Sequence, residues 1–446
     1  MNKCRILKGK KPRILLLLAL LTSITSTHSW SSTLATTAQI SLEKLALIVA
    51  ESEEVRAARE SARRLLLSDE TAKTKDGAAG LDRALDQWIM GQIVATINND
   101  PARPEFFWAV DNIPREWHGH IFPGAAVAIE NPDNVNRTAP IHGDWSYSLE
   151  GQFGTPKTAQ ISINVTRAES GQLRMGEAIS TMTDREIEAD ENGRFSITLD
   201  KSPANGRKNH MQLKDGSFML AVRDSHSDWI QQPTRLSLRV ISGPQPEVRK
   251  SEEELIAESA AGLYDFVQYW LNHKNKLWGK PNHNQMSGPM LREEEGGWGV
   301  LAGGRFHIKD DEALVITTSD GEAAYTGFQI SDPWTISPTP AYMTTSRNLS
   351  QLTANPDGNY TYVISLLDPG VANWINTAGL HEGWFMLRWQ NLPADTEVSS
   401  LVKEVRLVKL DKLNSALPGN IPEVSIASRR EEILQRIKLH NARSSE

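Results

Sequence analysis

A pattern that occurs twice in the chain constrains the fold more strongly than any other feature of the sequence. The first copy reads G-R-F-S-I-T-L at 193–199, N-H-M at 209–211 and L-K-D-G-S-F-M-L at 213–220. The second copy reads G-N-Y-T-Y-V-I at 358–364, N-W-I at 373–375 and L-H-E-G-W-F-M-L at 380–387. Short alternating runs bounded by Gly, Asn and Asp are typical of strands joined by tight turns. The repeat therefore predicts one β unit used twice, each copy burying one strand face against a second layer.

The pattern of apolar and turn-forming residues around the two copies divides the chain into segments. Residues 145–163 also resemble 314–330, which extends the correspondence to earlier strands. The alternative is a chance similarity of two β meanders, because acidic-Gly turns recur in hairpin proteins. We predict a mainly β protein with flanking helices. Its segments are 1–29 as a signal peptide, 30–105 as a helical region, 106–245 as the first β-sandwich unit, 246–298 as a helical linker and loop, 299–415 as the second β-sandwich unit, and 416–446 as a tail with a short helix.

Helical signals lie outside the two β regions. Apolar residues recur every three or four positions within 38–98, which predicts amphipathic helices. Ser251-x-x-Glu254 is a capping box, in which each side chain satisfies a backbone N–H at a helix start. Polar residues with Pro and Gly predict a loop at 272–297. Ser428-x-x-Glu431 predicts the start of a short final helix.

The N-terminus has the three parts of a secretory signal peptide. The first 13 residues hold six basic side chains and no acidic one, and an apolar run follows at 14–21. Small polar residues come next, and we predict cleavage near Ser29. The apolar run is shorter than the roughly 20 residues that span a bilayer, so an uncleaved anchor is the less favoured alternative. The sequence thus predicts a periplasmic or secreted protein with no transmembrane segment after signal removal.

The composition of the mature chain excludes several kinds of chemistry. The single cysteine, Cys4, precedes the apolar run, so the mature chain has no disulfide, thiolate nucleophile or Cys-based zinc site. Signal removal takes away six positive charges and no negative ones, which changes the formal charge from −7 to −13. A surface this acidic without a basic patch is a poor partner for nucleic acid. No cofactor is predicted.

Motifs in the second copy resemble a known family. They occur in order as F-Q-I-S-D-P-W at 328–334, S-R-N at 346–348, D-G at 357–358, D-P-G at 368–370, N-W at 373–374 and R-W at 388–389. This set resembles a bacterial family of exported proteins known as domain of unknown function twelve-fourteen. The resemblance covers most of 106–395 and is strongest at 328–390, and the first copy resembles a diverged version in which His210 replaces the Trp of N-W. It implies tandem jelly-roll-like β-sandwiches and no particular activity.

Three titratable residues of the second copy are candidates for catalysis. His381 and Glu382 form an adjacent base and acid, but the repeat aligns them with Lys214-Asp215, which indicates a hairpin turn. Asp368 could present a carboxylate at the end of a sheet, although Asp-Pro-Gly also makes an ordinary turn.

His118 and His120 are a weak metal candidate. On a strand, residues two positions apart face the same side, which suits two imidazoles on one ion. No acid follows at the spacing that a cupin-type site would need, and Pro114 and Pro123 place the pair near loops. We therefore predict no metal at this position.

Aromatic residues of the second copy are the strongest ligand-binding candidates. Rings on a sheet face can stack on flat ligands such as sugars, whereas buried rings fill the core. Arg388 beside Trp389 could clamp an anionic group. The candidate ligand-binding residues are Trp334, Asn373, Trp374, Trp384, Arg388 and Trp389.

Three functional hypotheses stay open at this point. The first is an exported, non-enzymatic envelope protein that binds a small molecule or glycan through the second β unit. The second is a periplasmic hydrolase or lyase that acts on a glycan or lipid-derived substrate. The third is a structural subunit of an envelope complex, which would use the terminal helices. The sequence predicts no oligomeric state.

Overall fold

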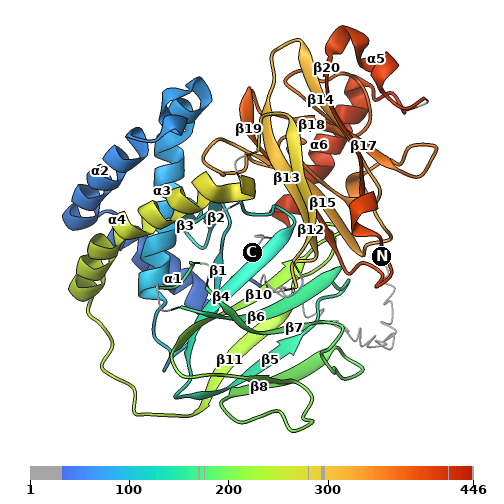
Figure 1. The fold of residues 1–446 in the computed structure, drawn as a ribbon. Coiled ribbons are helices and arrows are strands. Elements are labelled where there is room, and N and C mark those ends of the chain that lie inside the picture. The colour runs from blue at the N-terminus through green and yellow to red at the C-terminus, as the bar shows by residue number, and fades with distance from the viewer. Residues whose placement is uncertain are drawn as a thin grey trace, which may run out of the picture. The chain divides into compact units, whose positions relative to one another are not determined.

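The helical and β segments were examined in a computed structural model of the protein (Figure 1). The structure describes residues 33–127, 129–168, 171–174, 176–279, 281–292, 297–419 and 421–443. The predicted signal peptide at 1–29 lies outside the described residues, so its cleavage stays a prediction. No helix among the described residues is long and apolar enough to cross a membrane.

Helices form where the periodicity predicts them. The N-terminal region holds α1 (Thr37–Ala50), α2 (Glu53–Leu67) and α3 (Lys75–Ile97), and α4 (Glu252–Lys276) follows the first β unit. The Ser251–Glu254 capping box is present at the start of α4. Apolar faces of these four helices share one core cluster, in which Trp88 and Phe266 are fully buried.

The first β unit is a pair of antiparallel-rich sheets. One sheet has the order β1-β4-β10-β6-β7 and the other the order β11-β5-β8-β9. Their strands are β1 (Phe107–Ala109), β4 (Asn134–His142), β5 (Ser146–Gln152), β6 (Gln160–Arg167), β7 (Ala178–Thr183), β8 (Arg194–Asp200), β9 (His210–Gln212), β10 (Ser217–Ser225) and β11 (Arg235–Ser242). A separate hairpin holds β2 (Arg115–Trp117) and β3 (His120–Phe122).

The second β unit repeats this arrangement. Its sheets have the orders β12-β13-β19-β15-β16 and β18-β17-β14-β20. Their strands are β12 (Gln285–Leu291), β13 (Val300–His307), β14 (Glu312–Thr318), β15 (Tyr325–Ser331), β16 (Ser346–Asn348), β17 (Tyr360–Ser365), β18 (Trp374–Asn376), β19 (Glu382–Gln390) and β20 (Val402–Lys409). Short α5 (Leu413–Ala416) and α6 (Ile426–Asn441) end the chain.

The repeat in the sequence is a repeat in topology. The strand orders are the same position by position, and in each unit one pair, β8·β9 or β17·β18, is parallel. Each unit also has its own apolar core, which includes Phe218 in the first and Phe385 in the second. The mainly β, sandwich-like fold with an N-terminal helical region is therefore confirmed.

The repeated Asn of the two copies has a structural cause. Asn209 and Asn373 both adopt positive φ, of 49° and 54°. Each carboxamide clamps a backbone residue about twenty positions upstream, which is Glu188 for Asn209 and Thr353 for Asn373. Asn tolerates this left-handed conformation better than most residues do. The amide clamp therefore explains why both copies of the motif contain Asn.

A buried carboxylate joins the two β units. Asp133 of the first unit accepts hydrogen bonds from Tyr325 Oη at 3.0 Å and Asn348 Nδ2 at 3.1 Å, both from the second unit. Trp229 Nε1 donates to the same carboxylate at 2.7 Å. Asp133 is 1% exposed, so these bonds satisfy carboxyl oxygens that water does not reach.

Two predicted boundaries were wrong. The segment 272–297, predicted as loop, contains β12, an edge strand whose register shifts at Gly288-Pro289. Proline is tolerated on an edge strand because its missing N–H costs no ladder bond there. The final helix begins at Ile426 with Ser425 as its N-cap, rather than at Ser428, because the Ser425 hydroxyl accepts from the Ser428 N–H.

Candidate functional site

The four candidate tryptophans lie in the core. Their exposed fractions are 0% for Trp334, 7% for Trp374, 6% for Trp384 and 0% for Trp389. Each indole N–H donates to a neighbouring carbonyl or hydroxyl oxygen, and these acceptors are Gly77 O, Ser365 Oγ, Pro333 O and Ser319 O, respectively. The rings therefore fill the interior, and none of the four presents an open face on which a sugar could stack.

Arg388 and Asn373 are also committed to internal bonds. Arg388 is 8% exposed and donates to Gln329 Oε1 and to the backbone carbonyl of Ile129. Burial lowers the pKa of Arg388. Asn373 holds the Thr353 backbone as described above. Neither side chain points to a ligand surface.

The candidate acid–base residues have separate partners. Asp368 forms an ion pair with Arg429 of α6, with Nε and Oδ2 at 2.9 Å. The His381 ring contacts Asp310, with Nε2 and Oδ1 at 2.9 Å. The two residues therefore make no hydrogen bond with each other, as a direct acid–base pair would need.

The histidines of the β2–β3 hairpin do not share a strand face. His118 has φ of 45° and occupies the turn, while His120 begins β3. The Nε2 atom of His120 lies 2.7 Å from Oε2 of Glu43, a fully buried carboxylate that also binds Arg115 and Trp117. The i, i+2 geometry that would suit a metal is therefore absent, because a turn separates the pair.

Glu382 belongs to a different cluster. It is the first residue of β19 and pairs with His307, the last residue of β13, rather than lying in a turn as the repeat suggested. The imidazole of His283 completes the group, and one ligand atom from each of the three residues lies within 4.8 Å of the others. His307 Nδ1 and Glu382 Oε2 are 3.7 Å apart, and the two imidazole rings have centroids 5.1 Å apart.

A carboxamide fixes the two histidines relative to each other. Asn284, next to His283, donates from Nδ2 to the His307 carbonyl at 2.7 Å and accepts from the His307 N–H at 2.9 Å. Its φ of 61° turns the chain so that the backbone of His283 forms a β-bridge with Arg305 on β13. Sequence reasoning missed both histidines because local patterns reveal neither the register of β13 against β19, which brings His307 to Glu382, nor the bridge that places His283 beside Arg305.

The backbone of Glu382 is held in place, while one oxygen of its carboxylate has no hydrogen-bond partner among the described residues. Asp76 of α3 accepts from the backbone N–H groups of His381 at 2.6 Å and Glu382 at 3.2 Å, which fixes the start of β19. Glu382 Oε1 is buried and has no hydrogen-bond partner among the described residues. A buried carboxylate oxygen without a donor is costly, and a cation in contact with it would remove that cost.

Two imidazoles and one carboxylate are a known ligand set for transition metals. Zinc sites of this type bind at about 2.0–2.2 Å and leave a tetrahedral position open for water or substrate. Ligands of a tetrahedral ion lie about 3.4 Å apart at those bond lengths. The side chain of His307 is 52% exposed, so its ring has room to rotate toward the ion. Burial lowers the pKa of His283, and the nearby Arg305 lowers it further.

Comparison with known families adds an assignment for part of the chain. Residues 127–226 match the model described as protein of unknown function DUF1214. This segment is therefore similar to the DUF1214 family. It runs from just before β4 to just after β10, so the match lies in the first β unit, whereas the sequence motifs placed the strongest resemblance at 328–390.

The fold also has relatives among solved structures. A crystal structure of an uncharacterised protein from Burkholderia cenocepacia superposes with a TM-score of 0.66 at 19% identity, covering 83% of this chain and 100% of that one. A protein from Vibrio parahaemolyticus gives a TM-score of 0.39 at 11% identity, covering 63% of this chain and 90% of that one. The Burkholderia structure shows that the fold is shared. No curated protein matches the chain.

The DUF1214 segment also places a cation at the position that corresponds to the His283 cluster. Phe218 and Phe385 are equivalent in the repeat and pair with Ile141 and Gly304, respectively. Counting along the strands makes Asp144 equivalent to His307 and Asp215 equivalent to Glu382. In the first unit, the Lys201 ammonium lies 3.0 Å from Asp144 and 2.5 Å from Asp215.

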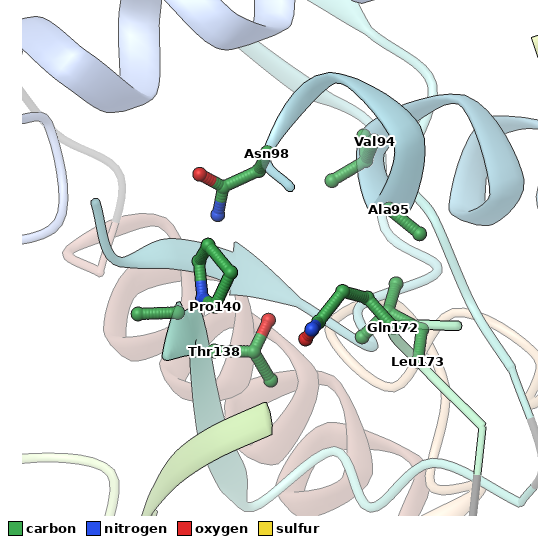
Figure 2. A pocket seen from close by; sticks show the side chains of 8 residues that line it. Val94, Ala95, Asn98, Thr138, Pro140, Gln172 and Leu173 are labelled. Carbon is green, nitrogen blue, oxygen red and sulfur yellow. The ribbon is translucent and has the colours of Figure 1, made fainter. Parts of the chain in front are cut away.

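A cavity between α3 and the DUF1214 segment is not a ligand site. Figure 2 shows its lining, which includes Val94, Asn98, Pro140 and Leu173. Its volume is about 10 Å³, which is room for about one water molecule.

Proposed function

We propose that this protein binds a divalent transition-metal ion such as Zn²⁺ through His283, His307 and Glu382. The observation that carries the proposal is the Glu382 carboxylate, which lies in a cluster with two imidazoles and whose buried Oε1 atom has no hydrogen-bond partner among the described residues. The ion would supply the partner that this oxygen lacks.

The donor set selects the class of metal. Imidazole nitrogens suit Zn²⁺, Cu²⁺, Fe²⁺ and Ni²⁺, whereas Ca²⁺ and Mg²⁺ prefer sites made of oxygen ligands. The set contains one carboxylate and two imidazoles, so we expect Zn²⁺ to bind and Mg²⁺ to bind weakly. Asn284 and Asp76 hold the backbone of His307 and Glu382 and so orient the ligands, as groups bonded to metal ligands do in metalloproteins.

Three protein ligands leave a coordination position open. Structural zinc sites close all four positions with protein side chains, while catalytic sites keep one for water or substrate. His283 and His307 are exposed, so the open position would face solvent. This arrangement supports a binding or hydrolytic role in the second β unit, and not a role confined to holding the fold.

We also propose that the protein works outside the cytoplasm. The basic segment, apolar run and small residues of 1–29 support export, and the mature chain would then meet metal ions of the periplasm or medium. Expression of the full chain in a Gram-negative host, followed by fractionation and N-terminal sequencing, tests this location. Full-length protein that stays in the cytoplasm would contradict it.

Calorimetric titration of the mature chain with Zn²⁺ tests the metal site. We expect one strongly bound ion per chain, and at least roughly 100-fold weaker binding in the His307→Ala variant, because loss of a ligand costs more than the roughly 10–100-fold loss seen when a group that only orients a ligand is removed. His118→Asn is the matched control, since it removes a histidine from a turn outside the cluster. Equal Zn²⁺ binding by wild type and His307→Ala would contradict the proposal.

A further inference from the structure

Beside the proposed metal site lies Arg305, whose guanidinium has no hydrogen-bond acceptor among the described residues. Arg305 is half-buried, and its guanidinium makes no hydrogen bond or ion pair with any described residue. The guanidinium lies against the Trp384 ring, whose centroid is 5.7 Å from Cζ. A guanidinium carries five N–H donors, so a half-buried one without acceptors is prepared for an anion.

Strand geometry places Arg305 on the same sheet face as the metal ligands. Arg305 and His307 are two residues apart on β13, and Glu382 and Trp384 are two residues apart on β19, so each pair shares a face. The register pairs Arg305 with Trp384 and His307 with Glu382. The four side chains therefore form one contiguous patch.

The loop before β12 closes the patch on a third side. The backbone of His283 forms a β-bridge with Arg305, and the Asn284 N–H donates to the Arg305 carbonyl at 2.7 Å. The Trp384 ring is fixed in turn, because its indole N–H donates to Pro333 O. A ring that cannot move gives the guanidinium a rigid surface on which to lie, which limits the entropy lost when a ligand binds.

The charge of the loaded site favours an anion. The ion's two positive charges and that of Arg305 exceed the single negative charge of Glu382. Arg is suited to bind an oxyanion through two parallel hydrogen bonds, and a metal with an open position takes an oxygen of the same group. Both groups would then act on one ligand.

We infer that the open metal position and Arg305 together bind the oxyanionic group of a ligand, either a phosphate or a carboxylate. This inference rests on the proposed metal site and names the ligand class for it. The first unit offers a contrast, since His142 and Ser217 occupy the places of Arg305 and Trp384 there, and Lys201 already forms ion pairs with both carboxylates.

The test uses mature protein loaded with one equivalent of Zn²⁺ and freed of excess ion. Calorimetric titrations with inorganic phosphate and with acetate form separate arms. We expect wild type to bind at least one of the two anions, the metal-free protein to bind it at least tenfold more weakly, and Arg305→Met to lose at least tenfold in anion affinity. Arg305→Met should keep the Zn²⁺ affinity of wild type within about twofold.

The outcomes separate the inference from the metal proposal. Binding of phosphate alone supports a phosphate-bearing ligand, and binding of both anions supports the wider oxyanion class. Loaded wild type that binds neither anion, or Arg305→Met that binds as tightly as wild type, overturns the inference while the metal site stands. Failure of wild type to bind Zn²⁺ overturns the proposed function itself. Arg305→Lys keeps the positive charge but loses the planar guanidinium that makes two parallel hydrogen bonds. This variant should show intermediate anion affinity.

Discussion

His307 and Glu382 lie directly opposite each other at the ends of β13 and β19, with Nδ1 and Oε2 3.7 Å apart. They are far apart in the sequence, and the pairing of two strands in the second β unit is what joins them. His283 then reaches the same place from the loop before β12. The proposed metal site depends on this juxtaposition of His283, His307 and Glu382.

Zn²⁺ should stabilise the folded chain. A ligand that binds only the native state adds about 2.7 kcal/mol when its concentration is 100 times its dissociation constant. We therefore expect a rise in Tm on adding Zn²⁺ to wild type, measured by differential scanning calorimetry. The double variant His283→Ala/His307→Ala should show no rise, and His118→Asn should show the full rise. An equal rise in all three proteins would place the bound metal elsewhere.

Asn284 should matter to metal affinity without being a ligand. Asn284→Gly keeps a residue that tolerates the φ of 61° and removes the carboxamide that clamps His307. We expect Zn²⁺ affinity to fall roughly 10–100-fold, the usual effect of removing a group that orients a metal ligand. Asn205→Gly is the matched control, because Asn205 is exposed and has a φ of 47° in a loop of the first unit. Unchanged affinity in Asn284→Gly would show that the clamp does not orient the ligands.

Glu43 should be a stability determinant with a defined pH dependence. Burial acts to raise the pKa of Glu43, but Arg115, Trp117 and Gln39 outweigh it and lower the pKa below the usual 4.5. Its contribution is then present above about pH 4.5 and is lost as the pH falls through the lowered pKa. Glu43→Ala should cost about 3 kcal/mol at pH 7, because Arg115 stays buried without this partner. Chemical denaturation at pH 7 and pH 3 measures both effects, and a loss that is as large at pH 3 would contradict the pKa assignment.

Glu130 should have the opposite pH dependence. Burial raises its pKa to about 7, although the Ser337 N–H opposes the shift by donating to the carboxylate. A folded pKa above the unfolded value means that stability is present below about pH 4.5 and is lost as the pH rises through 7. Wild type should therefore lose about 3 kcal/mol relative to Glu130→Gln between pH 4.5 and pH 8.5. A difference between the two proteins that stays constant with pH would refute this assignment.

The sequence predicted the repeated β architecture because short local sequence patterns carry the repeat. Gly193 and Gly358 precede equivalent strands, β8 and β17, and Asn209 and Asn373 make the same amide clamp. Such residues are set by the backbone conformation of their own turn, so neighbouring positions in the chain reveal them. The strand β12 was missed because Gly288-Pro289 interrupts its alternation.

The candidate site was predicted only in part, for a physical reason. Glu382 was named from the sequence, but the repeat placed it in a turn, and His283 and His307 were absent from the prediction. Which face of β19 is buried depends on tertiary packing, so Trp384 and Trp389 were read as ligand surface although both lie in the interior. Pairing register and face burial are properties of the folded sheet and not of any short segment.

The most direct test of the metal site is a crystal structure of the mature protein with Zn²⁺, measured on both sides of the zinc absorption edge. The account predicts one anomalous peak about 2.0–2.2 Å from nitrogen atoms of His283 and His307 and an oxygen of Glu382. Absence of a peak at these three residues, with zinc bound elsewhere or not at all, would contradict it.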